Sequence, residues 1–159
     1  KKMAFTSETS NSGYKAPSAL LRTEFKLEPG KDYEPVFSGK HDNSILGVAN
    51  KDYPAAAVAN SVMKRMIARG VIKPEQVVSI YKSRTFPTTG YGYVYNLKPE
   101  LAEKIKEAFR TFNWEGTALL KEFRTSEPPQ ESFIPITFKD NWAVIRQIDE
   151  AMGVSYACR

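Results

Sequence analysis

The sequence predicts an α/β fold in which a mostly parallel sheet is flanked by helices. Short apolar runs of strand length are each followed by a polar loop and then by apolar residues at helical spacing. Alternation of strand, loop and helix is typical of such folds, because each crossover helix covers a face of the sheet. The expected strands are Met3–Phe5, Tyr33–Phe37, Ala55–Val58 and Val77–Tyr81.

Helices are expected after these strands and again in the second half of the chain. Pro17 lies early in the first helix, where its missing N–H costs least. Gly70 ends a helix whose apolar stripe is formed by Val62, Met63, Met66 and Ile67. The other expected helical spans are 17–25, 44–50, 99–112, 115–123 and 142–152. Between them, Tyr91–Asn96 alternates like a further strand.

Length and composition set the broad class. The chain has 159 residues, enough for one ordinary core or for two small lobes. Its 42% hydrophobic and 26% charged residues fit a globular protein, and no apolar run approaches membrane-spanning length. A net charge of +5, with the charges scattered, mildly favours anionic partners. Cys158 is the one cysteine, so it forms no internal disulfide.

The loop after the first strand is the strongest functional signal. A hydroxyl-rich segment runs from Thr6 to Ser12 and leads directly into the first helix. Free N–H groups and the positive end of the helix dipole meet at such a point, which suits an anion. Ser10, Asn11 and Ser12 add neutral hydrogen-bond donors. The alternative is a plain N-cap, since Ser and Asn are the preferred capping residues.

A second polar loop, Ser38–Asn43, follows the second strand and contains His41, the one histidine of the chain. The carboxyl ends of parallel strands share one edge of a sheet, so both loops are expected at the same rim. On its own, a histidine in a Gly-Lys-His-Asp loop reads more simply as a surface side chain.

These stretches carry a resemblance to a known family. The sequence resembles the substrate-binding proteins of phosphonate and phosphite ABC transporters, a branch of the type II periplasmic binding proteins. The resemblance is collinear and covers essentially the whole chain. Its matching pieces are Ser10–Tyr14 with Pro17, Val36–His41, Ala55–Val58, Tyr81–Ser83, Phe86–Thr89, Asn113–Thr117 and Phe133–Ile136.

The resemblance implies a partial two-lobed protein. Residues 1–83 correspond to the second ligand-binding lobe, and residues 84–159 to the hinge return and the C-terminal part of the first lobe. About a hundred residues that build most of the first lobe would be missing. A shortened chain, a product of proteolysis, and one piece of a complex whose other chain supplies that segment all stay open.

Carried over residue by residue, the resemblance places the ligand's oxyanion on Ser10, Asn11, Ser12 and His41. Asn11 departs from the family's Thr by exchanging a hydroxyl for an amide. Relatives that take aminoalkyl phosphonates place carboxylates near Asn60-Ser61 and at Thr88, positions that are neutral here. A buried ammonium without a carboxylate is costly. The expected ligand is therefore phosphite, methylphosphonate, a similar small phosphonate, or phosphate.

The implied role is capture without chemistry and without a cofactor or metal. The partners would be the anion and a membrane permease, and the location the periplasm or the cell exterior as an anchored lipoprotein. One competing class is a hydrolase that uses Ser10 or Ser12 with His41 and Asp42, but no Gly-x-Ser-x-Gly elbow accompanies them. Nucleic-acid binding lacks a basic stripe. An anion sensor or scaffold of the same fold is the third alternative.

Overall fold

The computed structural model describes residues 1–83, 90–126 and 129–153, and these form two compact units. One unit comprises the described parts of Lys1–Thr88 and Trp142–Arg159, and the other those of Thr89–Asn141. The last helix, α7 (Ala143–Ala151), therefore groups with the N-terminal residues and packs against α1 (Ala16–Thr23). The assignment of 1–83 and 84–159 to two lobes of a binding protein stays a prediction.

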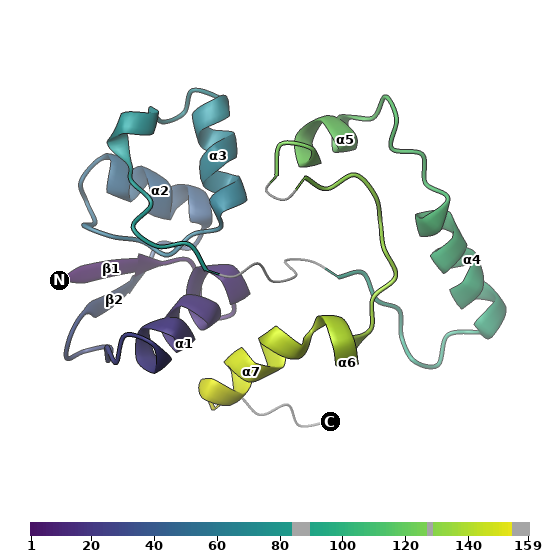
Figure 1. The fold of residues 1–159 in the computed structure, drawn as a ribbon, viewed down its shortest axis with the longest axis horizontal. Coiled ribbons are helices and arrows are strands. Elements are labelled where there is room, and N and C mark those ends of the chain that lie inside the picture. Colours follow the sequence, from purple (N-terminus) through teal and green to yellow (C-terminus); the bar gives the residue numbers. More distant parts are fainter. Residues whose placement is uncertain (84–89, 127–128, 154–159) are drawn as a thin grey trace. The chain divides into compact units, whose positions relative to one another are not determined.

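A small parallel sheet organises the first unit (Figure 1). Strands β1 (Lys2–Phe5) and β2 (Glu34–Phe37) pair in parallel, from Lys2 opposite Glu34 to Phe5 opposite Phe37. On the other side of β1, Ala4 forms a parallel bridge with Ala56, and two hydrogen bonds of 2.9 Å support it. The strand predicted at Ala55–Val58 is thus present only as this bridge. Its order places β1 in the centre, so all three carboxyl ends reach one rim.

Proline explains why β2 lies at the edge of this sheet. Pro35 has no N–H to give to a ladder, and within the described residues β2 pairs only with β1. β1 is the most buried part of the unit, since Ala4 and Phe5 are fully covered.

Helices follow each of these extended segments. A π-helical turn, η1 (Asn11–Lys15), leads from β1 into α1, and α2 (His41–Ala49) follows β2. Helix α3 (Asn60–Ala68) follows the Ala56 bridge, and a short 3-10 turn, η2 (Pro74–Gln76), comes next. α2 and α3 pack through a core of Ile45, Ala49, Met66 and Ile72. This alternation confirms the predicted α/β class.

The second predicted helix begins three residues earlier than expected. Lys40 has an extended backbone and its carbonyl accepts the N–H of Ser44 at 3.1 Å, which closes the first turn on His41. His41 is therefore the first residue of α2, held by a helix instead of by a free loop.

Two predicted strands are wrong. Val77–Tyr81 and Tyr91–Asn96 belong to no sheet in the part of the chain that the structure describes. Their apolar side chains face solvent: Val78 is 80% exposed, Ile80 83% and Tyr95 98%. The alternating pattern is present, but no described strand lies beside either segment to complete a ladder.

The second unit is helical and contains an aromatic cluster. It comprises α4 (Pro99–Arg110), α5 (Ala118–Phe123) and α6 (Phe138–Asn141). Phe133 lies at the centre of the cluster, with four rings whose centroids are 4.7 to 6.0 Å from its own: Tyr91, Phe109, Phe112 and Trp114. None of the helices described in either unit is long and apolar enough to span a bilayer.

Candidate anion-binding site

Ser10 forms the turn that opens η1. Its carbonyl accepts the N–H groups of Tyr14 at 3.1 Å and Lys15 at 2.9 Å, which is the wide hydrogen-bonding pattern of a π turn. Its hydroxyl accepts the N–H of Gly13 at 3.0 Å. Ser10 is thus an N-cap, which agrees with the capping alternative for this segment. The N–H groups of Asn11 and Ser12 have no hydrogen-bond acceptor among the described residues and remain available at the open end of the helix.

Gly13 allows this turn to lie directly on the end of β1. A Cβ on Gly13 would lie against the hydroxyl, the methyl group and the Cβ of Thr6, the last at only 2.8 Å. The backbones are joined at the same point, because the N–H of Thr6 donates to the Gly13 carbonyl at 3.1 Å. Close packing of Thr6 on Gly13 therefore fixes where the N–H groups of η1 point.

His41 connects three segments that are far apart in the sequence. Its Nε2 lies 3.2 Å from the hydroxyl oxygen of Ser12 in η1. Its Nδ1 accepts the backbone N–H of Ala59, the N-cap of α3, at 3.0 Å. An Nδ1 that accepts carries no hydrogen, so the proton of the neutral ring is on Nε2 and is donated to Ser12. The Ser12 hydroxyl, having accepted, keeps its own hydrogen for another acceptor.

The environment of His41 favours the neutral ring. Burial is the largest influence and lowers the pKa of His41 below its usual value. The Asp42 carboxylate raises that pKa and the Arg65 guanidinium lowers it further, both more weakly. A protonated ring would also place a hydrogen on Nδ1, facing the Ala59 N–H. Burial and hydrogen bonding therefore both hold the imidazole neutral.

The hydrogen bonds of His41 bring three helix N-termini together. They are the starts of η1, α2 and α3, each of which follows one of the three parallel extended segments. Each N-terminus presents backbone N–H groups and a partial positive charge. Three such ends at one rim form a place where an anion is stabilised without a formal positive charge.

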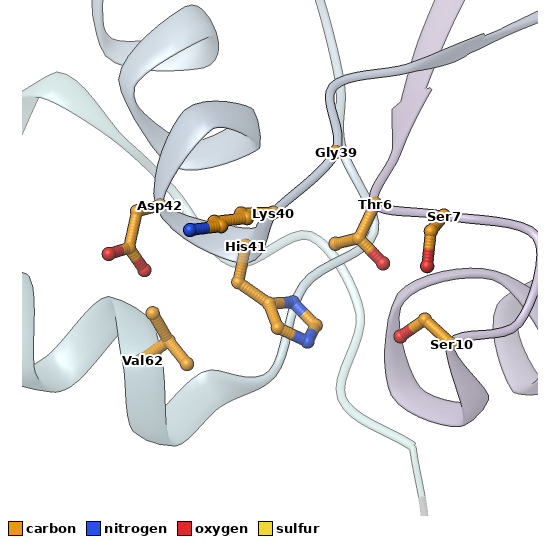
Figure 2. Close-up of a pocket in the computed structure, with 8 residues that line it drawn as sticks. All are labelled: Thr6, Ser7, Ser10, Gly39, Lys40, His41, Asp42 and Val62. Atoms are coloured by element: carbon orange, nitrogen blue, oxygen red, sulfur yellow. The ribbon is translucent and has the colours of Figure 1, made fainter.

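An open cavity of about 320 Å³ lies at this rim (Figure 2). Its charged residues, Lys40 and Asp42, are both exposed, and they carry opposite charges. The other walls are neutral, and most are hydroxyl-bearing or backbone. The cavity is lined by Thr6, Ser7, Ser10, Gly39, Lys40, His41, Asp42 and Val62.

The residues predicted for the site are distributed around this cavity. Ser10 and His41 line it, and Ser12 does not line it but is hydrogen-bonded to His41. Asn11 is the first residue of η1, and Asn60 is the first residue of α3, next to the Ala59 amide that binds His41. Thr88 lies outside the described residues.

Sequence reasoning missed two hydroxyls of the cavity. Thr6 and Ser7 belong to the same polar segment as Ser10, but the sequence points only to the residues next to the helix. Their position in the sequence could have indicated them, because they directly follow a buried strand and are therefore the first residues of the loop at the rim. Ser38 and Gly39 donate hydrogen bonds to the carbonyls of Phe5 and Thr6. These bonds tie the two loops together and so hold Thr6 and Ser7 at the rim.

The match to a family model decides the family. The model described as "ABC transporter, phosphonate, periplasmic substrate-binding protein" matches residues 1–142. The chain belongs to this family of periplasmic substrate-binding proteins. It is also 30% identical over 166 residues to the Phosphate-import protein PhnD of Mycolicibacterium smegmatis (strain ATCC 700084 / mc(2)155). That match covers 99% of this chain and 50% of the relative, so the chain spans about half the relative's length. The resemblance drawn from the sequence is thereby confirmed.

Proposed function

We propose that this substrate-binding protein captures a small tetrahedral phosphorus oxyanion and presents it to the membrane permease of an ABC importer. The observation that carries the proposal is the neutral chain of donors from the Ala59 amide through His41 to Ser12, placed where three helix N-termini meet. Such donors bind an anion and release it again, since no covalent step and no fixed opposite charge is involved.

The ligand we favour carries no amine. The first turn of α3 begins Asn60-Ser61 and has no acidic residue. Asp42 is the acid of the cavity, and it is exposed to solvent instead of being buried against a ligand. An ammonium group held there would lose its hydration without gaining a buried carboxylate. Among amine-free anions, phosphate is our first choice, because the relative from M. smegmatis is described as a phosphate-import protein.

We expect the binding cleft to be completed by a segment that corresponds to the other half of the relative's length. Residues 77–81 and 91–95 expose most of their apolar side chains, which suits segments that contact further parts of a protein. That half, on the same polypeptide or on a partner chain, would close over the anion and exclude water. The protein would work in the periplasm, or outside the membrane on a lipid anchor.

Calorimetric titration of the protein in its natural full length tests the proposal. The ligands are phosphate, methylphosphonate, phosphite and 2-aminoethylphosphonate, measured at the same pH and ionic strength. We expect binding of the amine-free ligands, and a weaker response to 2-aminoethylphosphonate. Tighter binding of 2-aminoethylphosphonate would overturn the reading of Asn60 and Ser61. Absence of binding by all four ligands would overturn the proposed function.

A further inference from the structure

Thr6 is a buried side chain whose hydroxyl is unused. The residue is 3% exposed, and its Oγ1 has no hydrogen-bond partner among the described residues. Its backbone is fully engaged: the N–H donates to the Gly13 carbonyl, and the carbonyl accepts the N–H of Gly39 at 2.7 Å. The position of Thr6 is therefore set by both loops of the rim, while its hydroxyl forms no hydrogen bond with any described residue.

The same side chain lines the cavity. Figure 2 shows the side chains of Thr6, Ser7 and Ser10 gathered on one side of the His41 ring, and all three residues line the cavity. Ser7 already pairs with Thr9, and Ser10 with the Gly13 amide. Thr6 differs from both because no group in the described part of the chain pairs with its hydroxyl. A buried polar group left unpaired is unfavourable, and such groups in proteins commonly have a functional reason.

We propose that Thr6 is a specificity-determining residue, whose hydroxyl binds one oxygen of the anion and thereby favours phosphate over ligands with three oxygens. This inference rests on the proposed function. The Thr6 hydroxyl is closed to water in this structure, so it reaches a ligand when its side chain turns from one staggered rotamer to another. Rotation about χ1 breaks none of the backbone hydrogen bonds of Thr6.

The chemistry of the fourth substituent gives the selectivity. Phosphate presents oxygen in all four directions, whereas methylphosphonate has a methyl group and phosphite a hydrogen in one of them. The N–H groups of Asn11 and Ser12 and the Ser12 hydroxyl, which His41 orients, engage three oxygens, and the fourth substituent then lies toward the floor of the cavity. An oxygen there pairs with Thr6, and a threonine hydroxyl both donates and accepts, so it suits P–O⁻ and P–OH alike. A methyl group there leaves Thr6 unpaired, which is how polar sites reject analogues.

The test compares Thr6→Val, which keeps the shape and removes the hydroxyl, with Thr6→Ser, which keeps the hydroxyl. Dissociation constants for phosphate and methylphosphonate are measured by calorimetry on the full-length protein, together with the melting temperature. For Thr6→Val we expect phosphate binding to weaken by roughly fivefold to tenfold and methylphosphonate binding to stay unchanged. The melting temperature should stay equal or rise, because an unpaired buried hydroxyl is removed. Thr6→Ser should keep the preference for phosphate.

Ser18 offers a matched control. It is also buried, at 7% exposure, with an unpartnered hydroxyl, but it lies in α1 and does not line the cavity. Ser18→Ala should leave both affinities unchanged. If Thr6→Val does not fold, Thr6→Ala takes its place with the same expectations for the affinities.

Two results would overturn the inference: equal affinities in Thr6→Val and wild type, or an equal loss for both ligands together with a lower melting temperature. The failure of the proposed function is distinguishable, because wild type would then bind neither ligand. If wild type binds phosphate and Ser12→Ala weakens it while Thr6→Val does not, only the role of Thr6 is refuted.

Discussion

The Nε2 atom of His41 lies 3.2 Å from the Oγ of Ser12, across 29 residues of sequence. This contact joins the two polar loops at the rim of the sheet and, with the Ala59 amide on the other ring nitrogen, fixes the tautomer of the imidazole. Ser12 is thereby oriented as a donor, since its oxygen is occupied by the histidine proton. The relationship gives the site both its geometry and its neutrality.

Replacing Ser12 by Ala should weaken anion binding and leave the fold intact. The change removes the last donor of the chain that starts at Ala59, and a hydrogen bond to a charged ligand is stronger than a neutral one. We expect a loss of roughly tenfold to a hundredfold in phosphate affinity by calorimetry. Thr9→Ala is the control, because Thr9 is exposed and outside the cavity. Unchanged affinity in Ser12→Ala would mean that the anion binds elsewhere.

Acid should destabilise the fold through His41. An unfolded histidine titrates near 6.5, and burial lowers the pKa of His41 in the folded state, so the unfolded chain binds the proton more readily. The contribution of His41 to stability is then complete above about pH 6.5. It declines as the pH falls from there toward the pKa of His41 in the folded state.

Urea unfolding of wild type and His41→Gln from about pH 5 to about pH 8 measures this contribution. His41 is the one histidine, so the variant should lose most of the pH dependence near neutrality. Parallel stability curves for the two proteins would contradict a lowered pKa.

Gly13→Ala should destabilise the protein by about 1–3 kcal/mol through overpacking. Its new Cβ would clash with the Thr6 side chain. The Thr6 backbone is hydrogen-bonded to Gly13 and Gly39, so it moves away only if both loops of the rim move as well. Gly92→Ala provides the matched control, because no atom lies within 4 Å of the Cβ it would add. Chemical denaturation compares the two variants, and a cost shared equally by both would point to a general effect of glycine replacement.

The ion pair between Lys15 and Asp149 should contribute to the stability of the first unit. The Nζ–Oδ1 distance is 3.2 Å, and the side chains are only 18% and 4% exposed. Asp149→Asn removes one charge of a largely buried pair, for which we expect a loss of about 3 kcal/mol. Glu131→Gln is the control, since its pair with Arg124 is exposed and worth about 1 kcal/mol or less. Equal effects in urea unfolding would show that burial of the first pair is unimportant.

The placement of several candidate site residues at one rim could be predicted from the sequence because it depends on local order. A strand, a run of hydroxyls and a helix start are readable in the Thr6–Ser12 segment, and the parallel arrangement brings His41 to the same rim. The residue-level details were not readable. Thr6 became a candidate only when its burial and its missing partner were known, and these arise from packing against Gly13.

The wrong predictions about the fold concern features that depend on packing partners and not on local order. Val77–Tyr81 has the composition of a strand, but a strand also needs a neighbour, and periodicity does not say whether one is present. Likewise, the N-terminal shift of α2 depends on the extended backbone of Lys40, which precedes the apolar pattern used to place the helix. Local patterns thus indicate which conformation a segment favours, and the packing decides whether it is adopted.

Because α7 packs on α1, the first unit is assembled from both ends of the chain, with the second unit inserted between them. Lys15 and Asp149 are separated by 134 residues, so their contact forms only after that whole stretch has left the ribosome. During synthesis η1, which contains Lys15, is made well before its partner Asp149. Contacts of such large sequence separation slow folding. The rim of the sheet, which this turn helps to form, accordingly gains this support 134 residues after Lys15 has been made.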